Sequence, residues 1–253
     1  ETPDKKETPA EEAVASDIQT EGTQVSGSPN KSDDKTPSLD VPSPAGPSLL
    51  DQYTAHYPDW AKDFARKYFT KTLTQFIIYG NVRDLVAAGG DDGKSEYVSL
   101  HEFLVDELFA SRDIVLFYDR SSGIHFADKE SQKDFNRALS GYDTIFGTDY
   151  AKKLPKDPVR VLAVLQNYFR LRLADGKRIA CIIDYAETVI PMAEASMYSE
   201  GDRNALVFLQ KWAHDPLFLS SDFTVTLITQ NLSELNQQIV QSPYTAEIQI
   251  PIP

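Results

Sequence analysis

A run of five apolar residues, Ile179 to Ile183, constrains the fold of this chain most, because it ends abruptly at the charged residue Asp184. A strand exposed on one face alternates apolar and polar residues, whereas a continuous run rich in β-branched residues is typical of a strand buried on both faces. Such strands occur mainly in parallel sheets covered by helices, and ligands bind at the carboxyl ends of their strands. The run therefore predicts a core strand with Asp184 at a ligand-binding edge, although an aspartate that only ends the strand stays the simpler interpretation.

The remainder of the ordered sequence alternates short apolar runs with amphipathic stretches, a pattern that favours βαβ units and a mostly parallel sheet. We expect further strands at 75–80, 114–118, 223–229 and 246–252. We expect helices at 58–73, 100–109, 129–139, 158–174, 202–213 and 231–240, and a short helical piece at 82–86. The predicted fold class is α/β, a three-layer α/β/α sandwich.

Residues 1–48 differ from the rest in composition. They hold no aromatic residue and seven of the 15 prolines, and their ten acidic against four basic side chains give a net charge of −6. Such a segment buries too little apolar surface to offset its ordering entropy, so we expect a disordered acidic tail before an ordered domain at 49–253. An interaction tail is the functional alternative to a plain linker.

Composition excludes several classes of function. The net charge of −13 opposes binding to a phosphate backbone, so a nucleic-acid partner is not expected. The one cysteine, Cys181, lies inside the apolar run and offers neither a disulfide framework nor a thiolate metal site. No stretch approaches 18 consecutive apolar residues, so no membrane span is expected and the default location is the cytoplasm.

Three strand ends together carry a resemblance to a known family. The segments Q-F-I-I-Y-G (75–80), C-I-I-D-Y-A-E (181–187) and T-L-I-T-Q-N-L-S-E-L (226–235) follow an order and spacing that resembles the large subdomain of AAA+ ATPases, with its P-loop NTPase-like sheet. The resemblance implies that Gly80 and Asn81 lie where a phosphate-binding loop begins. It also implies that Asp184 is the magnesium-associated aspartate, and that Asn231 is a sensor residue in the nucleotide site.

The phosphate-loop segment departs from the family pattern. A phosphate loop needs glycines, a Lys, and a Ser or Thr for Mg²⁺, whereas Gly80 is followed by Asn81, Val82, Arg83 and Asp84. The charge of Arg83 is offset by Asp84, so no net positive cradle is expected. A Gly-Lys-Ser at 93–95 lacks the earlier glycine and its strand, and we interpret it as a surface turn.

The acidic motif is altered as well. The active family pattern has Glu directly after the Asp, but here Tyr185 follows Asp184 and the next carboxylate is Glu187. Asp184 and Glu187 could share a Mg²⁺ or a water if the chain turns there, and a vestigial site or an acidic pair at a helix start is the alternative. No Arg follows Arg203, so the segment near 241–244 supplies no arginine finger.

We therefore expect a degenerate AAA+ module without bound cofactor, forming the N-terminal part of a longer ATPase. The resemblance implies a homo-oligomer built through that larger protein, with protein partners or substrates. The alternative is a working ATPase that holds ATP and Mg²⁺ through an unconventional loop, with Asp184 and Glu187 as its catalytic carboxylates.

Overall fold

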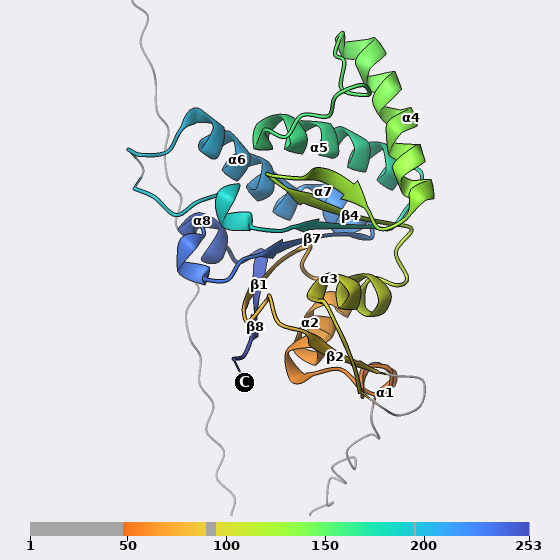
Figure 1. The fold of residues 1–253 in the computed structure, drawn as a ribbon, viewed down its shortest axis with the longest axis vertical. Helices are drawn as coiled ribbons and strands as arrows, with labels where there is room; N and C mark the ends of the chain where they lie inside the picture. The colour runs from red at the N-terminus through yellow and green to blue at the C-terminus, as the bar shows by residue number, and fades with distance from the viewer. Residues whose placement is uncertain (1–47, 90–94, 195, 253) are drawn as a thin grey trace, which may run out of the picture. The chain divides into compact units, whose positions relative to one another are not determined.

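A six-stranded sheet forms the centre of the computed structural model, which describes residues 48–89, 95–194 and 196–252. The strand order is β5-β4-β6-β7-β1-β8 (Figure 1), and every neighbouring pair is parallel except β4 and β5. The strands are β1 (Gln75–Gly80), β4 (Ile114–Asp119), β5 (Gly123–Phe126), β6 (Ile179–Ile183), β7 (Phe223–Ile228) and β8 (Thr245–Ile250). The expected mostly parallel α/β sheet is confirmed.

Burial along the strands follows their sequence patterns. Every residue of β6 and β7 is buried, as a continuous apolar run predicts for a strand with helices on both faces. The edge strand β8 alternates instead, with Ala246, Ile248 and Ile250 buried between exposed neighbours. Cys181 is fully buried in β6, in agreement with its interpretation as a core residue.

Helices cover both faces of the sheet and complete the three layers (Figure 1). The first face is packed by α2 (Asp59–Phe69), α3 (Leu100–Phe103) and the π-helix η1 (Leu104–Leu108), preceded by α1 (Leu49–Tyr53). The second face is packed by α4 (Lys129–Phe146), α5 (Pro158–Ala174), α6 (Glu200–His214) and α7 (Pro216–Ser220).

Side chains at the helix starts explain where these helices begin. The carboxylates of Asp128 and Asp157 accept backbone N–H groups at the starts of α4 and α5. Ser199 and Asp202 form a capping box at the start of α6, which satisfies two N–H groups reciprocally. The helix predicted at 158–174 is found with those bounds.

Three local predictions were wrong. Residues 82–86 do not form a helical piece, because the chain turns after β1 and Val86 begins a hairpin of β2 (Val86–Gly89) with β3 (Ser95–Val98). The helix expected over 231–240 is a 3-10 turn, η3 (Leu232–Glu234), and then α8 (Gln237–Val240), which Asn236 caps. The helix at 129–139 continues to Phe146.

Residues 1–47, with the predicted tail, and 90–94 lie outside the described residues.

The connections after β1 and β7 leave toward opposite faces of the sheet. The connection from β1 leads through α3 and η1, whose Phe103 and Leu104 pack on the first face. The connection from β7 leads through η3 and α8, where Leu235 after η3 and Ile239 in α8 pack on the second face. Because β1 and β7 are adjacent, the carboxyl ends of these two strands form the topological switch point where α/β sheets bind ligands.

Candidate functional site

Asp184 follows the last residue of β6 and lies buried at the carboxyl edge of the sheet, with 6% of its surface exposed. Its backbone N–H donates to the Tyr118 carbonyl at 2.9 Å, which continues the pairing of β6 with β4. One carboxylate oxygen, Oδ1, accepts the N–H of Tyr185 at 2.8 Å. The placement at the strand end agrees with the sequence prediction, and the partners of the second oxygen decide what the carboxylate can do.

Two basic residues, Arg83 and His101, contact the second oxygen of Asp184. The guanidinium Nη1 of Arg83 donates to Oδ2 at 2.9 Å, and the ring nitrogen Nε2 of His101 lies 3.2 Å from the same atom. Burial alone raises the pKa of Asp184, but the hydrogen bonds from His101 and Arg83 and the charge of Arg83 outweigh it and lower the pKa to about 2. The carboxylate is therefore ionised and already neutralised by this chain.

Arg83 is held from a second side by Tyr185. Its guanidinium carbon lies 4.0 Å from the centre of the Tyr185 ring, a cation–π contact. Tyr185 has φ 50° and ψ 46°, a left-handed conformation that costs a non-glycine residue about 1 kcal/mol. Burial alone lowers the pKa of Arg83, but the hydrogen bond and the charge of Asp184 raise it by more than burial lowers it. The net pKa is therefore raised and the guanidinium stays charged.

The backbone N–H groups at the end of β1 and in the loop after it donate hydrogen bonds to carbonyl groups of this chain. Gly80 N–H donates to the Gln230 carbonyl at 3.0 Å, Asn81 N–H to the Ile250 carbonyl at 3.1 Å, and Val82 N–H to the Gly80 carbonyl at 2.8 Å. A phosphate cradle needs such groups free and converging on one point. The bond from Gly80 to Gln230 also joins the chain segments that follow β1 and β7, so backbone lies across the switch point.

Gly80 has a structural reason to be glycine. Its φ is +97°, and a Cβ at this position would lie 2.3 Å from the carbonyl oxygen of Ile250 in β8. The glycine therefore allows the close approach of β1 and β8 rather than that of a phosphate. The Asn81 side chain next to it donates to Asp84 Oδ2 at 2.7 Å, whereas Arg83 donates to Asp184.

Among the described residues, the other two predicted residues make no hydrogen bond with Asp184, although the charge of Glu187 helps to raise the pKa of Arg83. Glu187 is half-buried in η2 (Ala186–Thr188), and its Oε2 is buried without a hydrogen-bond partner among the described residues. Asn231 is exposed after β7, and its amide donates to Glu234 Oε1 at 2.9 Å. Within the described part of the chain no hydrogen bond joins Asn231 to Asp184, and no group of three or more metal-ligating side chains is present.

Sequence reasoning missed Arg83 and His101 as partners of Asp184. Arg83 carried a signal, because it follows a parallel strand and therefore lies at the same edge as Asp184. His101 carried none, since it lies in the first turn of α3, after a hairpin that the sequence did not predict. The carboxylate of Asp184 and the first N–H groups of the segment after β1 already have partners in this chain.

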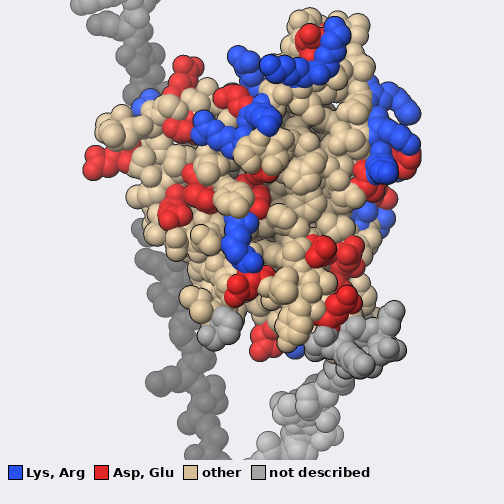
Figure 2. Space-filling model, viewed as in Figure 1, with Lys and Arg blue, Asp and Glu red and all other residues tan. Residues whose placement is uncertain are grey.

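The surface around the site carries both signs of charge. On the face that Figure 2 shows, acidic and basic side chains are interspersed, without one broad basic surface. No helix of the described residues has the length and apolar character that crossing a bilayer requires.

The parallel sheet, its helices on two faces and an acidic residue at a strand end define a P-loop NTPase-like α/β domain of the AAA+ class. The chain belongs to one family of that class, described as AAA+ chaperone, N-terminal Rossmann-like domain, whose family model matches residues 43–251. The AAA+ resemblance read from the three strand ends is confirmed.

The chain was also compared with curated protein sequences and with solved structures. A search of curated protein sequences found no match. A solved structure, the E. coli MS115-1 HORMA:CdnC:Trip13 complex, contains a chain with 12% sequence identity and a TM-score of 0.43. The similarity covers 81% of the present chain and 56% of that chain, so the present chain spans about half the length of this neighbour.

Proposed function

We propose that this domain is a degenerate AAA+ module that does not hydrolyse ATP and that serves assembly, regulation or substrate engagement in a larger AAA+ protein. The observation that carries the proposal is the contact of Arg83 with Asp184 at 2.9 Å. The resemblance implies that this aspartate would face Mg²⁺, and the guanidinium supplies a fixed positive charge in its place. A protein cation held from two sides makes the domain independent of a metal ion.

The loop after β1 supports the same conclusion. Its first three N–H groups donate to backbone carbonyls, and its Asp84 adds negative charge near the position that a triphosphate would require. Binding ATP there would break these hydrogen bonds and bring like charges together, each at a cost in free energy. The module therefore contributes a shape and a surface, while hydrolysis belongs to another domain.

The alternative is a working ATPase with an unconventional loop. It is favoured by the placement of Asp184 at a strand end and by the Glu187 Oε2, a buried oxygen without a partner in the described residues. For this alternative Arg83 and His101 must leave Asp184 so that Mg²⁺ can bind. It therefore predicts a nucleotide affinity that depends on Asp184 and increases when Arg83 is removed.

Titration calorimetry of the 253-residue chain with ATP and MgCl₂ separates the two functions. We expect no binding heat for wild type, Asp184→Ala or Arg83→Ala up to about 2 mM ATP, with each protein folded by circular dichroism. Binding of wild type with a Kd of about 10 µM that is lost in Asp184→Ala would contradict the proposal. His214→Ala, in α6 and away from the sheet edge, is the matched control.

The role within a larger protein needs its own test. In a longer chain that carries this domain beside an ATPase domain, we expect Asp184→Ala to alter assembly or partner binding, because it loosens the module. The ATPase rate per assembled particle should stay within about twofold of wild type, since the chemistry lies elsewhere. Loss of hydrolysis with assembly intact would instead place a catalytic carboxylate here.

A further inference from the structure

The C-terminal half of α4 presents apolar side chains that this chain does not cover. The buried residues of α4 are Ser131, Phe135 and Leu139, all in its first eleven residues. Beyond them, Ile145 is 76% exposed and Phe146 59% exposed. Figure 1 shows this half of α4 extending past α5, away from the sheet. The helix therefore ends in a solvent-exposed apolar face.

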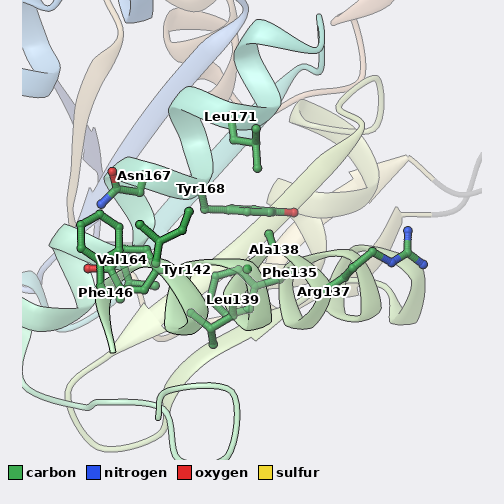
Figure 3. A pocket seen from close by; sticks show the side chains of 12 residues that line it. Phe135, Arg137, Ala138, Leu139, Tyr142, Phe146, Val164, Asn167, Tyr168 and Leu171 are labelled. Atoms are coloured by element: carbon green, nitrogen blue, oxygen red, sulfur yellow. The ribbon is translucent and has the colours of Figure 1, made fainter. Parts of the chain in front are cut away.

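A groove of about 380 Å³ lies between α4 and α5 along this face (Figure 3). Aromatic and aliphatic side chains form most of its walls, and Leu171 of α5 is 47% exposed there. Figure 3 shows Phe146 at one end of the groove and Arg137 at the other, where the guanidinium points away from the apolar side chains. No ion pair of Arg137 is among those of the described residues.

The exposed end of α4 is held in one conformation. Gly147 closes the helix with φ 66°, and the Asp143 carboxylate accepts the N–H groups of Tyr150 and Ala151 at 2.9 and 2.7 Å. The Tyr142 and Phe146 rings pack at 4.4 Å between centres. A surface ordered in advance loses less entropy when it binds, so this apolar face is suited to a partner.

Gly141 lies in the middle of this face. Glycine inside a helix is less stable than alanine, and such a glycine usually has a packing reason. Here a Cβ would meet no atom of the described chain within 4 Å, so the chain itself provides no reason. A backbone that approaches closely from outside would provide one, because a side chain at position 141 would hold it away.

We propose that this face pairs with the same face of a second copy of the chain, with the two α4 helices antiparallel about a two-fold axis. Positions 138 and 145 are equally far from an axis between 141 and 142. Ile145 of each copy therefore lies opposite Ala138 of the other, and Tyr142 lies opposite Gly141. Each large side chain meets a small one, as a self-complementary interface requires.

The spacing and charge of α4 support this arrangement. Ala138, Gly141 and Ile145 follow the three- and four-residue steps that align side chains along one seam between helices. In the antiparallel pair Arg137 lies level with the C-terminal end of the other α4, where the helix dipole is negative. The contact spans about three turns and the net charge of −13 opposes it, so we expect a weak dimer with a Kd on the order of 10–100 µM.

Sedimentation equilibrium of the 253-residue chain from about 5 to about 500 µM tests the dimer. We expect wild type to dimerise, and Ile145→Glu and Gly141→Leu each to raise the Kd at least about tenfold with unchanged circular dichroism. Val207→Glu is the matched control, because Val207 is 44% exposed on α6 and outside the groove. Wild type that stays monomeric at about 500 µM would overturn the proposal and leave the groove to a different protein.

Oxidative cross-linking locates the interface by proximity, in a measurement independent of the dimer affinity. Because Cys181 is the only cysteine and is buried, Tyr142→Cys adds a single accessible thiol close to the proposed axis. We expect it to form a disulfide-linked dimer at least about tenfold faster than Val207→Cys at equal concentration. Equal rates, or a wild-type dimer that Ile145→Glu leaves unchanged, would show that α4 does not form the contact.

Discussion

Both ends of the parallel sheet carry an aspartate bound to an arginine, but the two pairs differ in what they join. At the amino end, Asp113 and Arg178 precede β4 and β6, and strand register alone places them side by side. At the carboxyl end, Arg83 follows β1 and Asp184 follows β6, so the guanidinium reaches across the end of β7, which lies between them. The first pair reinforces the sheet, whereas the second fills the region where a ligand of this fold would lie.

The two pairs also differ in how far their carboxylates are exposed to solvent. The pKa of Asp113 falls to about 2 chiefly through its hydrogen bonds with Arg178, and 29% of the Asp113 side chain is exposed. The pKa of Asp184 also reaches about 2, but against a burial penalty and with only 9% of the side chain exposed. The same pKa therefore belongs to a partly exposed surface pair and to a buried carboxylate that depends on its contacts with Arg83 and His101. The two ends should respond differently to the same changes.

The largest difference should come from two of the glycines with positive φ, Gly80 at the carboxyl end and Gly176 at the amino end. A Cβ on Gly80 lies 2.3 Å from the Ile250 carbonyl oxygen, whereas a Cβ on Gly176 meets nothing within 4 Å. We expect Gly80→Ala to lower the free energy of unfolding by about 3 kcal/mol, from strain and a displaced β8, and Gly176→Ala by about 1 kcal/mol. Urea unfolding measures both, and equal losses would contradict the close approach of β8.

Removing the aspartates should have the next largest effect. Asp184→Ala leaves the Arg83 guanidinium without its carboxylate, and we expect a loss of about 2 kcal/mol because Arg83 can regain only partial hydration. Asp113→Ala leaves Arg178 in water, so its loss in urea unfolding should be clearly smaller. If Asp113→Ala proved as costly as Asp184→Ala, burial would not distinguish the two pairs.

The same contrast shows what a sequence can predict here. The continuous run 179–183 predicted a buried parallel strand, because a strand buried on both faces is apolar at every position. That pattern can be read from the segment itself, without knowing which strands pair with it. It also placed Asp184 at the correct edge. The position of Arg83 after a parallel strand indicated only the shared edge, since the contact itself depends on how the five residues between β1 and the following hairpin turn.

The ion-pair partners of charged loop residues are harder to predict from a sequence than the burial of strands. Asp84 is adjacent to Arg83 in the chain and was predicted to offset it, yet Arg83 pairs with a residue 101 positions away. Asn81 takes Asp84 instead. Sequence proximity describes net charge well and hydrogen-bond partners badly, because a side chain of Arg length reaches several neighbouring strand ends.

The pH dependence of stability should separate the pairs as well. The folded-state pKa of Asp184 is about 2 and the ordinary value is 3.8, so the unfolded chain binds this proton more tightly. The resulting stability, about 2 kcal/mol, is complete above about pH 4 and is lost as the pH falls to about 2. We expect Asp184→Asn to lack this loss in urea unfolding at about 0.5 M salt, which screens the exposed Asp113 pair. Parallel curves for wild type and variant would show that Asp184 titrates normally.

The smallest effect should come from the two non-glycine residues that have positive φ in the described part of the chain, Tyr185 at the carboxyl end and Lys71 at the amino end. Asn tolerates this conformation, so each substitution by Asn relieves roughly 0.5–1 kcal/mol of strain. Lys71→Asn removes an ion pair whose lysine is 68% exposed, and we expect net stabilisation by urea unfolding. Tyr185→Asn also removes the ring beneath Arg83, worth about 0.5–1 kcal/mol, so its stability should stay within about 0.5 kcal/mol of wild type. If Tyr185→Asn stabilised the domain as much as Lys71→Asn, the ring would contribute nothing, and Arg83 would be held on Asp184 by charge alone.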